Sequence, residues 1–342
     1  MVVNKIINQL KSRFLNLSPY SPKVNKDKGF TMVELIVSMF IATLVITPML
    51  AMANNMLSTD RREQARSTAE DELQIALEYI SRDLQQSVYI YDQTGVDAIS
   101  AQLPQSTDNT TITPVLVFWK RKLIEDSVPV NRTVNSNQCS GNSPNEADCN
   151  DGFVYALVGY FLVEGGSDIW SKTARIGRFE IQDGVTRTDN NQFVDEDDSR
   201  VGIDDGFKIF ELSGGFSITE SMNAWQRNGE YSTGSLPQSN VLIDYAYQST
   251  VEDDPDAPPS EDCPVDSDTS DTDPEWESVP ANNQSPGFYT CVFSSQNKAR
   301  VFLRGNALAR VRKSSVPTYK DSGRAFFPTA TIEVQGTGLL RN

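Results

Sequence analysis

Histidine is absent from the 342 residues of this sequence. Its absence excludes Ser-His-Asp and Cys-His nucleophile pairs, histidine-ligated metals and the usual general base at neutral pH. The sequence also lacks a Walker A motif, a G-x-S-x-G motif and a glycine-rich loop between a strand and a helix. Carboxylates are plentiful, but acids this common do not single out a glycosidase pair. We therefore expect no enzymatic activity and no cofactor.

Glycine and proline are too few for a low-complexity chain, at 20 and 17 residues, so we expect a folded protein. Basic residues are also in the minority, with 30 Lys and Arg against 46 Asp and Glu and a net charge of −16. Such a chain repels a phosphate backbone at long range, which argues against general nucleic-acid binding.

Charge is missing altogether from residues 35–59. As a helix this stretch would be about 37 Å long, enough to cross a hydrocarbon core of roughly 30 Å. Residues 1–29 carry six cations and one anion, whereas residues 54–73 carry three cations. The positive-inside rule then predicts a single-pass membrane protein with a cytoplasmic N-terminus and an exported C-terminal body.

An ordinary secretion signal is the alternative, because Ala51, Met52 and Ala53 have the A-x-A form of a signal peptidase site. The apolar region at 35–53 is longer than the usual signal, and the basic region before it is unusually extended. A membrane anchor fits these lengths better.

Residues 28–35 read KGFTMVEL, so a basic residue and a glycine precede a phenylalanine, and one acid lies near the start of the apolar stretch. A carboxylate at the end of a membrane helix is unfavourable and indicates a function. This run resembles the class III signal of type IV pilins and pseudopilins. The resemblance implies that a prepilin peptidase cuts after Gly29, that the new N-terminal Phe30 is methylated, and that Glu34 assists assembly. A plain anchor with a snorkelling glutamate is the alternative interpretation.

The implied assembly step has a simple electrostatic basis. Cleavage creates an ammonium group on Phe30, and Glu34 of an incoming subunit can pair with the ammonium of its neighbour inside an apolar bundle. Each charge alone would be unfavourable there, whereas the pair is tolerated. The resemblance implies that the partners are other pilins or pseudopilins, the prepilin peptidase and an inner-membrane assembly platform. It also implies that the chain crosses the inner membrane once and that its head is periplasmic or lies within an extracellular pilus.

A second helical pattern follows the apolar stretch, from Asp60 to about Gln86. Its apolar residues are spaced by three and four, which marks one face of a helix. We expect one helix, kinked at Pro48, with an assembly part at 30–57 and an amphipathic part at 58–92. The stripe comprises Ala65, Ala69, Leu73, Ala76, Leu77, Ile80 and Leu84.

Short β-rich runs separated by turn residues fill 93–342, without helical patterns of ten residues between them, so the sheet should be antiparallel. The fold class is α+β and pilin-like: a long N-terminal helix packed on an antiparallel sheet with long loops. The head is large for a pilin, which indicates either long insertions or a two-part β region. The runs are 115–123, 153–163, 175–182, 207–212, 216–219, 241–247, 288–293, 301–304 and 330–334.

Four cysteines permit three pairings, and we expect the sequence-local ones, Cys139 with Cys149 and Cys263 with Cys291. Export would place them in an oxidising compartment. Zinc is the rival interpretation, but it requires close C-x-x-C spacing or histidines, and the sequence has neither.

Acidic residues concentrate in two places. Residues 252–277 hold twelve acids, and residues 195–198 are all acidic, followed by Asp204 and Asp205. Neither stretch has EF-hand spacing, so solvated acidic loops are the first interpretation, and calcium binding is a weaker one. The weak calcium candidates are Asp266, Asp268, Asp271 and Asp273.

The size of the chain, the helix through residues 82–84 to 88–91 and the run VFLRGNA at 301–307 resemble the hormogonium polysaccharide secretion pseudopilins of cyanobacteria. The general pattern is also similar to the minor pilin W and pseudopilin J families. The resemblance implies a minor subunit of a type IV pilus-like or type II secretion-like assembly that supports polysaccharide secretion and gliding motility. A membrane-anchored or pilus-tip adhesin is the alternative, and an exported enzyme is the third.

Overall fold

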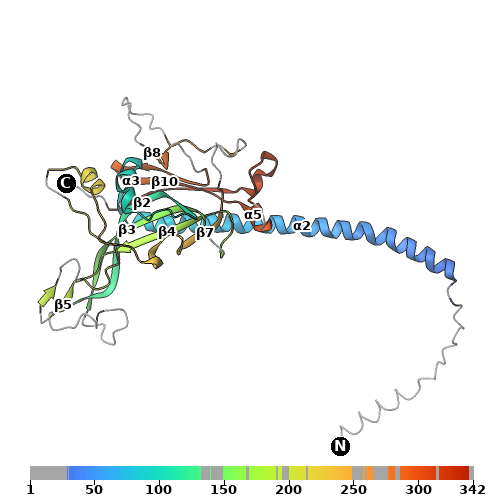
Figure 1. Cartoon of the computed structure of the whole chain (residues 1–342), viewed down its shortest axis with the longest axis horizontal. Coiled ribbons are helices and arrows are strands. Elements are labelled where there is room, and N and C mark those ends of the chain that lie inside the picture. The colour runs from blue at the N-terminus through green and yellow to red at the C-terminus, as the bar shows by residue number, and fades with distance from the viewer. Residues whose placement is uncertain are drawn as a thin grey trace, which may run out of the picture. The chain divides into compact units, whose positions relative to one another are not determined.

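We describe the chain from a computed structural model. The described residues are 29, 31–131, 139, 149–166, 169–189, 192–194, 200–212, 215–248, 257–258, 260–264, 276–281, 286–312 and 316–338. The chain divides into two units, Met1–Leu57 and Ser58–Asn342. Among the described residues, the second unit holds all the strands (Figure 1).

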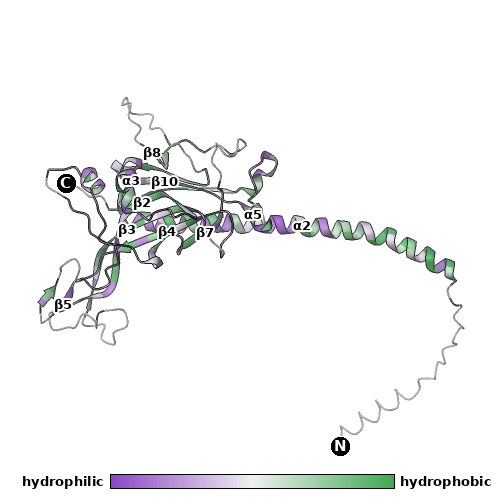
Figure 2. Ribbon diagram, in the orientation of Figure 1, coloured by the Kyte–Doolittle hydropathy of each residue, from purple (hydrophilic) through white to green (hydrophobic). Residues whose placement is uncertain are grey.

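Helix α2 (Met32–Gln85) is 54 residues long, contains Pro48 and contributes to both units. It begins where the Thr31 hydroxyl accepts a hydrogen bond from the Glu34 backbone N–H at 3.2 Å, which satisfies one of the free donors of the first turn. All residues of α2 up to Leu57 are exposed. Figure 2 shows this part of the helix as largely hydrophobic and the following turns as more polar.

The second part of α2 buries one stripe, which confirms the amphipathic pattern in the sequence. The helix ends at Gln85, however, and residues 87–90 form strand β1. The expectation of helix through residue 92 is therefore wrong in its last turns. Ser-Val-Tyr-Ile favours an extended backbone, and β1 pairs with β2. The buried apolar residues of α2 are Ala65, Ala69, Leu73, Ala76, Leu77, Ile80 and Leu84.

Two sheets and a hairpin make up the β structure, and all the strand pairs among the described residues are antiparallel. The five-stranded sheet has the order β1 (Ser87–Ile90), β2 (Thr110–Pro129), β3 (Cys149–Gly165), β4 (Ala174–Gln182) and β7 (Val241–Ala246). The four-stranded sheet has the order β11 (Thr329–Gln335), β10 (Lys298–Arg304), β9 (Phe288–Phe293) and β8 (Glu277–Val279). The hairpin joins β5 (Arg187–Asp189) and β6 (Gln192–Val194).

The long sheet has one face toward α2 and the other toward loops that follow β6. Side chains alternate between the faces of a strand. In β2, Lys120 reaches Asp83 of α2, whereas its neighbour Trp119 stacks edge-on against Phe207 and Trp225. The sheet is thus covered on both faces, which explains the nearly continuous burial of residues 156–163 in β3.

One hydrophobic cluster includes residues from α2 and from both sheets. The sheets also meet through a hydrogen bond from the Thr290 hydroxyl in β9 to the Val115 carbonyl in β2, at 2.7 Å. The β-rich region therefore shares one core instead of splitting into two bodies.

Of the nine strands expected from the sequence, seven are present and the other two predictions, at 207–212 and 216–219, are wrong. Residues 207–212 form no strand, because Phe207 and Phe210 pack around Trp119 across the sheet face. In the 216–219 run, a capping box of Ser217 and Glu220 begins helix α4 (Ile218–Asn223). The other short helices are α3 (Gln93–Ile99), η1 (Ser100–Gln102), η5 (Thr233–Ser235), η7 (Ser294–Gln296), α5 (Ala307–Val311) and η8 (Asp321–Phe326).

Candidate functional site

The start of α2 is the first candidate site, because the predicted assembly residue lies there. Glu34 is exposed in the first turn, and its carboxylate makes no hydrogen bond or ion pair with another described residue. Its carbonyl accepts a hydrogen bond from the Ser38 hydroxyl at 2.6 Å. An added side chain at Gly29 would meet nothing within 4 Å, and Phe30 lies outside the described residues. The Glu34 carboxylate is therefore available to a partner.

The apolar stretch that follows is uncovered on all sides. By length and composition it can cross a membrane, with a mean hydropathy of 2.3 over eighteen residues. Large exposed apolar surfaces on a chain indicate contact with lipid or with another protein. The exposed large hydrophobic residues are Met32, Val33, Leu35, Ile36, Val37, Met39, Phe40, Ile41, Leu44, Val45, Ile46, Met49, Leu50, Met52, Met56 and Leu57.

A group of buried charges fastens the second part of α2 to the five-stranded sheet. Asp83 of α2 accepts hydrogen bonds from Lys120 Nζ at 2.9 Å, Tyr160 Oη at 2.7 Å and Arg178 Nε at 2.9 Å. Glu180, beside Arg178 in β4, pairs with Lys120 at 3.1 Å. We call Asp83, Lys120, Tyr160, Arg178 and Glu180 the helix-sheet network.

The network favours the charged forms of Glu180 and Arg178 and the neutral form of Tyr160. Burial alone would raise the pKa of Glu180, but the charges of Arg178 and Lys120 and a hydrogen bond from Lys122 outweigh it and lower the pKa to about 2. Burial also opposes the charge of Arg178, and the Asp83 and Glu180 carboxylates overcome it and raise the pKa of that guanidinium. Burial, with the charge of Asp83, raises the pKa of Tyr160 well above its ordinary value, so the phenol stays a donor.

The sequence analysis did not find this network. Asp83 and Arg178, which contact each other directly, are 95 residues apart in the sequence. A signal was present, because charged residues occupy alternate positions beside apolar runs, Lys120 and Lys122 in β2 and Arg178 and Glu180 in β4. Alternate charges on a buried strand require partners on the facing element.

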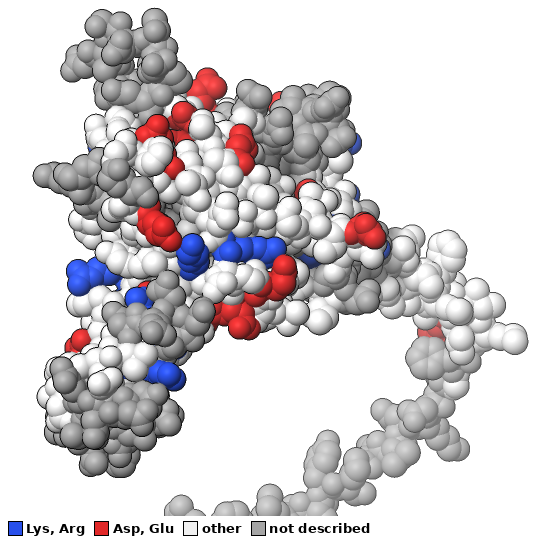
Figure 3. Space-filling model, turned by 60° about the vertical axis from the view of Figure 1, so that its left-hand side comes forward, with Lys and Arg blue, Asp and Glu red and all other residues white. Residues whose placement is uncertain are grey.

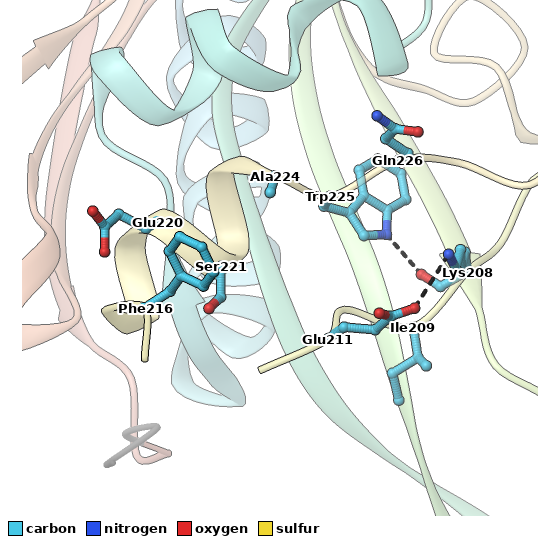
Figure 4. A pocket seen from close by; sticks show the side chains of 9 residues that line it. All are labelled: Lys208, Ile209, Glu211, Phe216, Glu220, Ser221, Ala224, Trp225 and Gln226. Carbon is cyan, nitrogen blue, oxygen red and sulfur yellow. Dashed lines mark hydrogen bonds and ion pairs between the residues drawn. The ribbon is translucent and has the colours of Figure 1, made fainter. Parts of the chain in front are cut away.

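A pocket of about 360 Å³ lies beside α4 and is open to solvent. Figure 4 shows Phe216 and Glu220 on one side of it and Lys208, Glu211 and Trp225 on the other. The Trp225 indole donates to the Lys208 carbonyl at 2.7 Å, and the Lys208 ammonium pairs with Glu211 at 3.2 Å. Phe216 is 61% exposed, so the pocket offers an aromatic surface with charged groups at its edge.

Both carboxylates of this pocket already have local partners. The Ser217 backbone N–H and hydroxyl donate to Glu220 at 2.7 and 2.9 Å and lower the pKa of that carboxyl. A hydrogen-bonded, ionised carboxylate suits a cap better than a proton donor. The arrangement fits binding of a small polar ligand by stacking and hydrogen bonds.

The structure contains two disulfides, Cys139–Cys149 with an S–S distance of 2.06 Å and Cys263–Cys291 with 2.04 Å. The calcium candidates Asp266, Asp268, Asp271 and Asp273, and the acids at 195–198, lie outside the described residues. Within the described part of the chain, no group of three or more Asp, Glu, Cys or His is placed to hold a metal ion. The calcium interpretation stays a prediction.

Charges of both signs share the surface of the second unit. On the face drawn in Figure 3, basic side chains form a band with acidic side chains on both sides of it. On this face, the described residues therefore form no broad basic surface of the kind that binds a nucleic-acid backbone.

Comparison with known proteins gave one match, at the start of α2. Residues 24–50 match the family described as the prokaryotic N-terminal methylation motif. This range includes Gly29, Phe30 and Glu34 and most of the exposed apolar stretch. No curated protein and no solved structure showed significant similarity to the chain. The comparison therefore identifies an N-terminal signal of the type IV pilin and pseudopilin kind, carried by an α+β protein.

Proposed function

We propose that this protein is a subunit of a type IV pilus-like or type II secretion-like assembly. The observation that carries the proposal is the N-terminal methylation motif at residues 24–50, which leads into a helix whose first part is apolar and exposed. Proteins with this motif are structural subunits. The apolar side chains in the first part of α2 are not covered by other described residues of the chain. In a filament, the apolar helices of neighbouring subunits would cover one another.

Within this proposal, each part of the motif has a role. Prepilin peptidase removes residues 1–29, Phe30 becomes the methylated N-terminus, and Glu34 pairs with the ammonium group of a neighbouring subunit. Residues 30–57 form the membrane and assembly helix, and the rest of α2 carries the exported β-rich head. The accessible carboxylate of Glu34 supports its assembly role.

Orientation and compartment are part of the proposal. The excess of cations in residues 1–29 supports a cytoplasmic N-terminus. Two disulfides in the second unit support export of the head, since disulfides persist in oxidising compartments. We further propose a minor subunit that supports polysaccharide secretion and gliding motility, on the resemblance of the helix and of residues 301–307 to the secretion pseudopilins.

Glu34→Gln tests the assembly role. The change keeps side-chain length but removes the charge, so the variant should still insert and be processed while its recruitment by other pilins falls at least tenfold. Membrane fractionation and co-purification with the partner pilins measure the two outcomes. Glu63→Gln is the matched control, because Glu63 is an exposed acid on the same helix beyond the apolar stretch. If Glu34→Gln is recruited as well as the parent, Glu34 is no assembly contact.

A pilus-tip or membrane-anchored adhesin is the second candidate, and the pocket beside α4 is the observation that favours it. An exposed aromatic ring next to charged side chains can stack on a sugar or bind a short peptide. Phe216→Ala should then reduce surface adhesion while leaving recruitment into the filament unchanged. Equal adhesion by parent and variant would remove the support that this pocket gives to the adhesin.

A further inference from the structure

A second pocket lies between α2 and the segment 308–327, within the second unit, and measures about 470 Å³. Arg62 of α2, Arg312 and Lys320 contribute the cations of its lining, and Leu308, Phe326 and Phe327 contribute apolar side chains. We call it the Arg62 pocket. Helix α5 lies beside α2 (Figure 1), and an ion pair between Arg310 and Glu72 links the two helices.

The charge of the Arg62 pocket is opposite to that of the chain. None of its lining residues carries a carboxylate, although the chain as a whole has a net charge of −16. The side chains of Arg62, Arg312 and Lys320 make no hydrogen bond or ion pair with other described residues. Two acids are adjacent to these cations in the sequence, Glu63 after Arg62 and Asp321 after Lys320, but neither lines the pocket. The Asp321 carboxylate accepts a hydrogen bond from Tyr319 at 3.2 Å. Within the described part of the chain, the pocket thus presents three cations without an ion-pair partner.

The apolar wall indicates that the ligand is amphipathic. Phe327 is buried in a cluster with Tyr247 and Tyr319, and Leu308 and Phe326 pack against that cluster while also lining the pocket. A small inorganic anion would gain nothing from these rings. A phosphate attached to an apolar body would contact both the cations and the rings.

The position of Arg62 on the helix, close to the end of the charge-free stretch, indicates that such a ligand is a membrane lipid. The charge-free stretch ends at Thr59, three residues before Arg62. At about 1.5 Å per residue this is roughly 5 Å along the axis, comparable to the thickness of a lipid headgroup layer. Basic side chains directly after a membrane span attract anionic lipids.

We propose that the Arg62 pocket binds the headgroup of an anionic phospholipid, with the phosphate held by Arg62, Arg312 and Lys320 and the glycerol backbone against Phe326. This inference rests on the membrane anchoring in the proposed function. It adds a contact that holds the head at the membrane surface until the subunit leaves the bilayer for a filament.

The test uses the full chain in neutral detergent micelles and three soluble probes: dihexanoyl phosphatidylglycerol, dihexanoyl phosphatidylcholine and inorganic phosphate. We expect the phosphatidylglycerol probe to raise the melting temperature and to bind at least tenfold more tightly than the other two. Loss of one cation should weaken its binding on the order of fivefold in Arg62→Gln, and more in the double variant Arg312→Gln with Lys320→Gln.

Arg61→Gln is the matched control. Arg61 is exposed and adjacent to Arg62 on the helix, but it does not line the pocket, so its loss should change the affinity by less than twofold. Equal weakening by Arg61→Gln and Arg62→Gln would overturn the pocket in favour of general attraction to charge. Equal binding of inorganic phosphate and the phosphatidylglycerol probe would overturn the lipid assignment.

The membrane anchoring is checked separately by fractionating cells that express the parent. Parent protein in the soluble fraction would contradict the proposed function itself. Parent protein in the membrane fraction that shows no preference for the anionic probe would overturn only the Arg62 pocket. Melting temperatures of all variants without lipid show whether each one is folded.

Discussion

The two parts of α2 are both helical, but the apolar side chains of the first part are exposed, whereas an apolar stripe of the second part is buried. Up to Leu57 every residue is exposed, including sixteen large hydrophobic side chains. From Ser58 onward, small and branched apolar residues form one stripe, and that stripe is buried in the core of the second unit. The first part therefore depends on a cover from outside the chain, whereas the second part is covered by the chain's own sheet.

This difference separates two sources of stability. Hydrophobic burial and the helix-sheet network hold the second part of α2 regardless of its partners. In the proposed function, lipid or neighbouring helices cover the first part, and the head has its own core in either surrounding. A subunit that leaves a bilayer for a filament would require this independence.

The largest expected effect concerns the first part. Gly29→Ala should leave residues 1–29 attached, because a side chain would occupy the position next to the bond that the peptidase cuts. Terminal sequencing by mass spectrometry should find parent protein beginning at an N-methylated Phe30 and variant protein beginning at Met1. Ser38→Ala, in the same apolar stretch, should be processed like the parent. A parent terminus at Asn54 would indicate ordinary signal peptidase instead.

The next effect concerns the second part. Asp83→Ala removes the carboxylate that accepts hydrogen bonds from Lys120, Tyr160 and Arg178. These three buried donors would then lack that acceptor. Breaking a buried ion pair in this way should lower the free energy of unfolding by about 3–5 kcal/mol. Urea unfolding of the full chain in detergent, followed by tryptophan fluorescence, measures the loss.

Glu78→Ala is the control on the same helix. Its carboxylate pairs with Arg82 at the surface, with both side chains more than 60% exposed, so the loss should stay below about 0.5 kcal/mol. Equal losses for the two variants would show that the network does not fasten α2 to the sheet.

Sequence patterns predicted the parts of the fold that local periodicity determines. The stripe of α2 and long strands such as β2 and β3 were found because their apolar residues recur at helical spacing or in continuous runs. Residues 207–212 have the same composition as a strand, yet Phe207 and Phe210 cover Trp119 instead. Local sequence cannot distinguish a strand from a loop that supplies rings to a sheet face.

The candidate sites also differ in whether local sequence can reveal them. The motif around Gly29 and Glu34 is contiguous, so it can be recognised in the sequence alone. The helix-sheet network and the Arg62 pocket join residues that lie far apart in the chain, and strand register and packing determine which of them meet. Only the pairing of Tyr160 with Arg178 across β3 and β4 places both beside Asp83.

The smallest effect is the acid sensitivity of the helix-sheet network. The folded state lowers the pKa of Glu180 to about 2 from its ordinary value of 4.5. Glu180 therefore contributes stability above about pH 4.5, and this contribution is lost as the pH falls from there toward 2. The loss should reach about 2 kcal/mol by pH 3. Acid should have the opposite effect on stability through Asp204. Burial raises the pKa of this carboxyl, so protonation removes an unfavourable buried charge from the folded state.

Urea unfolding at pH 7 and pH 3, for the parent and for Glu180→Gln, isolates this contribution. The variant should be less stable than the parent at pH 7. Because it lacks the titrating carboxyl, its free energy of unfolding should fall less than the parent's between pH 7 and pH 3, and the difference between the two falls should be about 2 kcal/mol. An equal fall in parent and variant would assign the acid sensitivity to other carboxylates, and the second part of α2 would then depend less on charge than its contacts indicate.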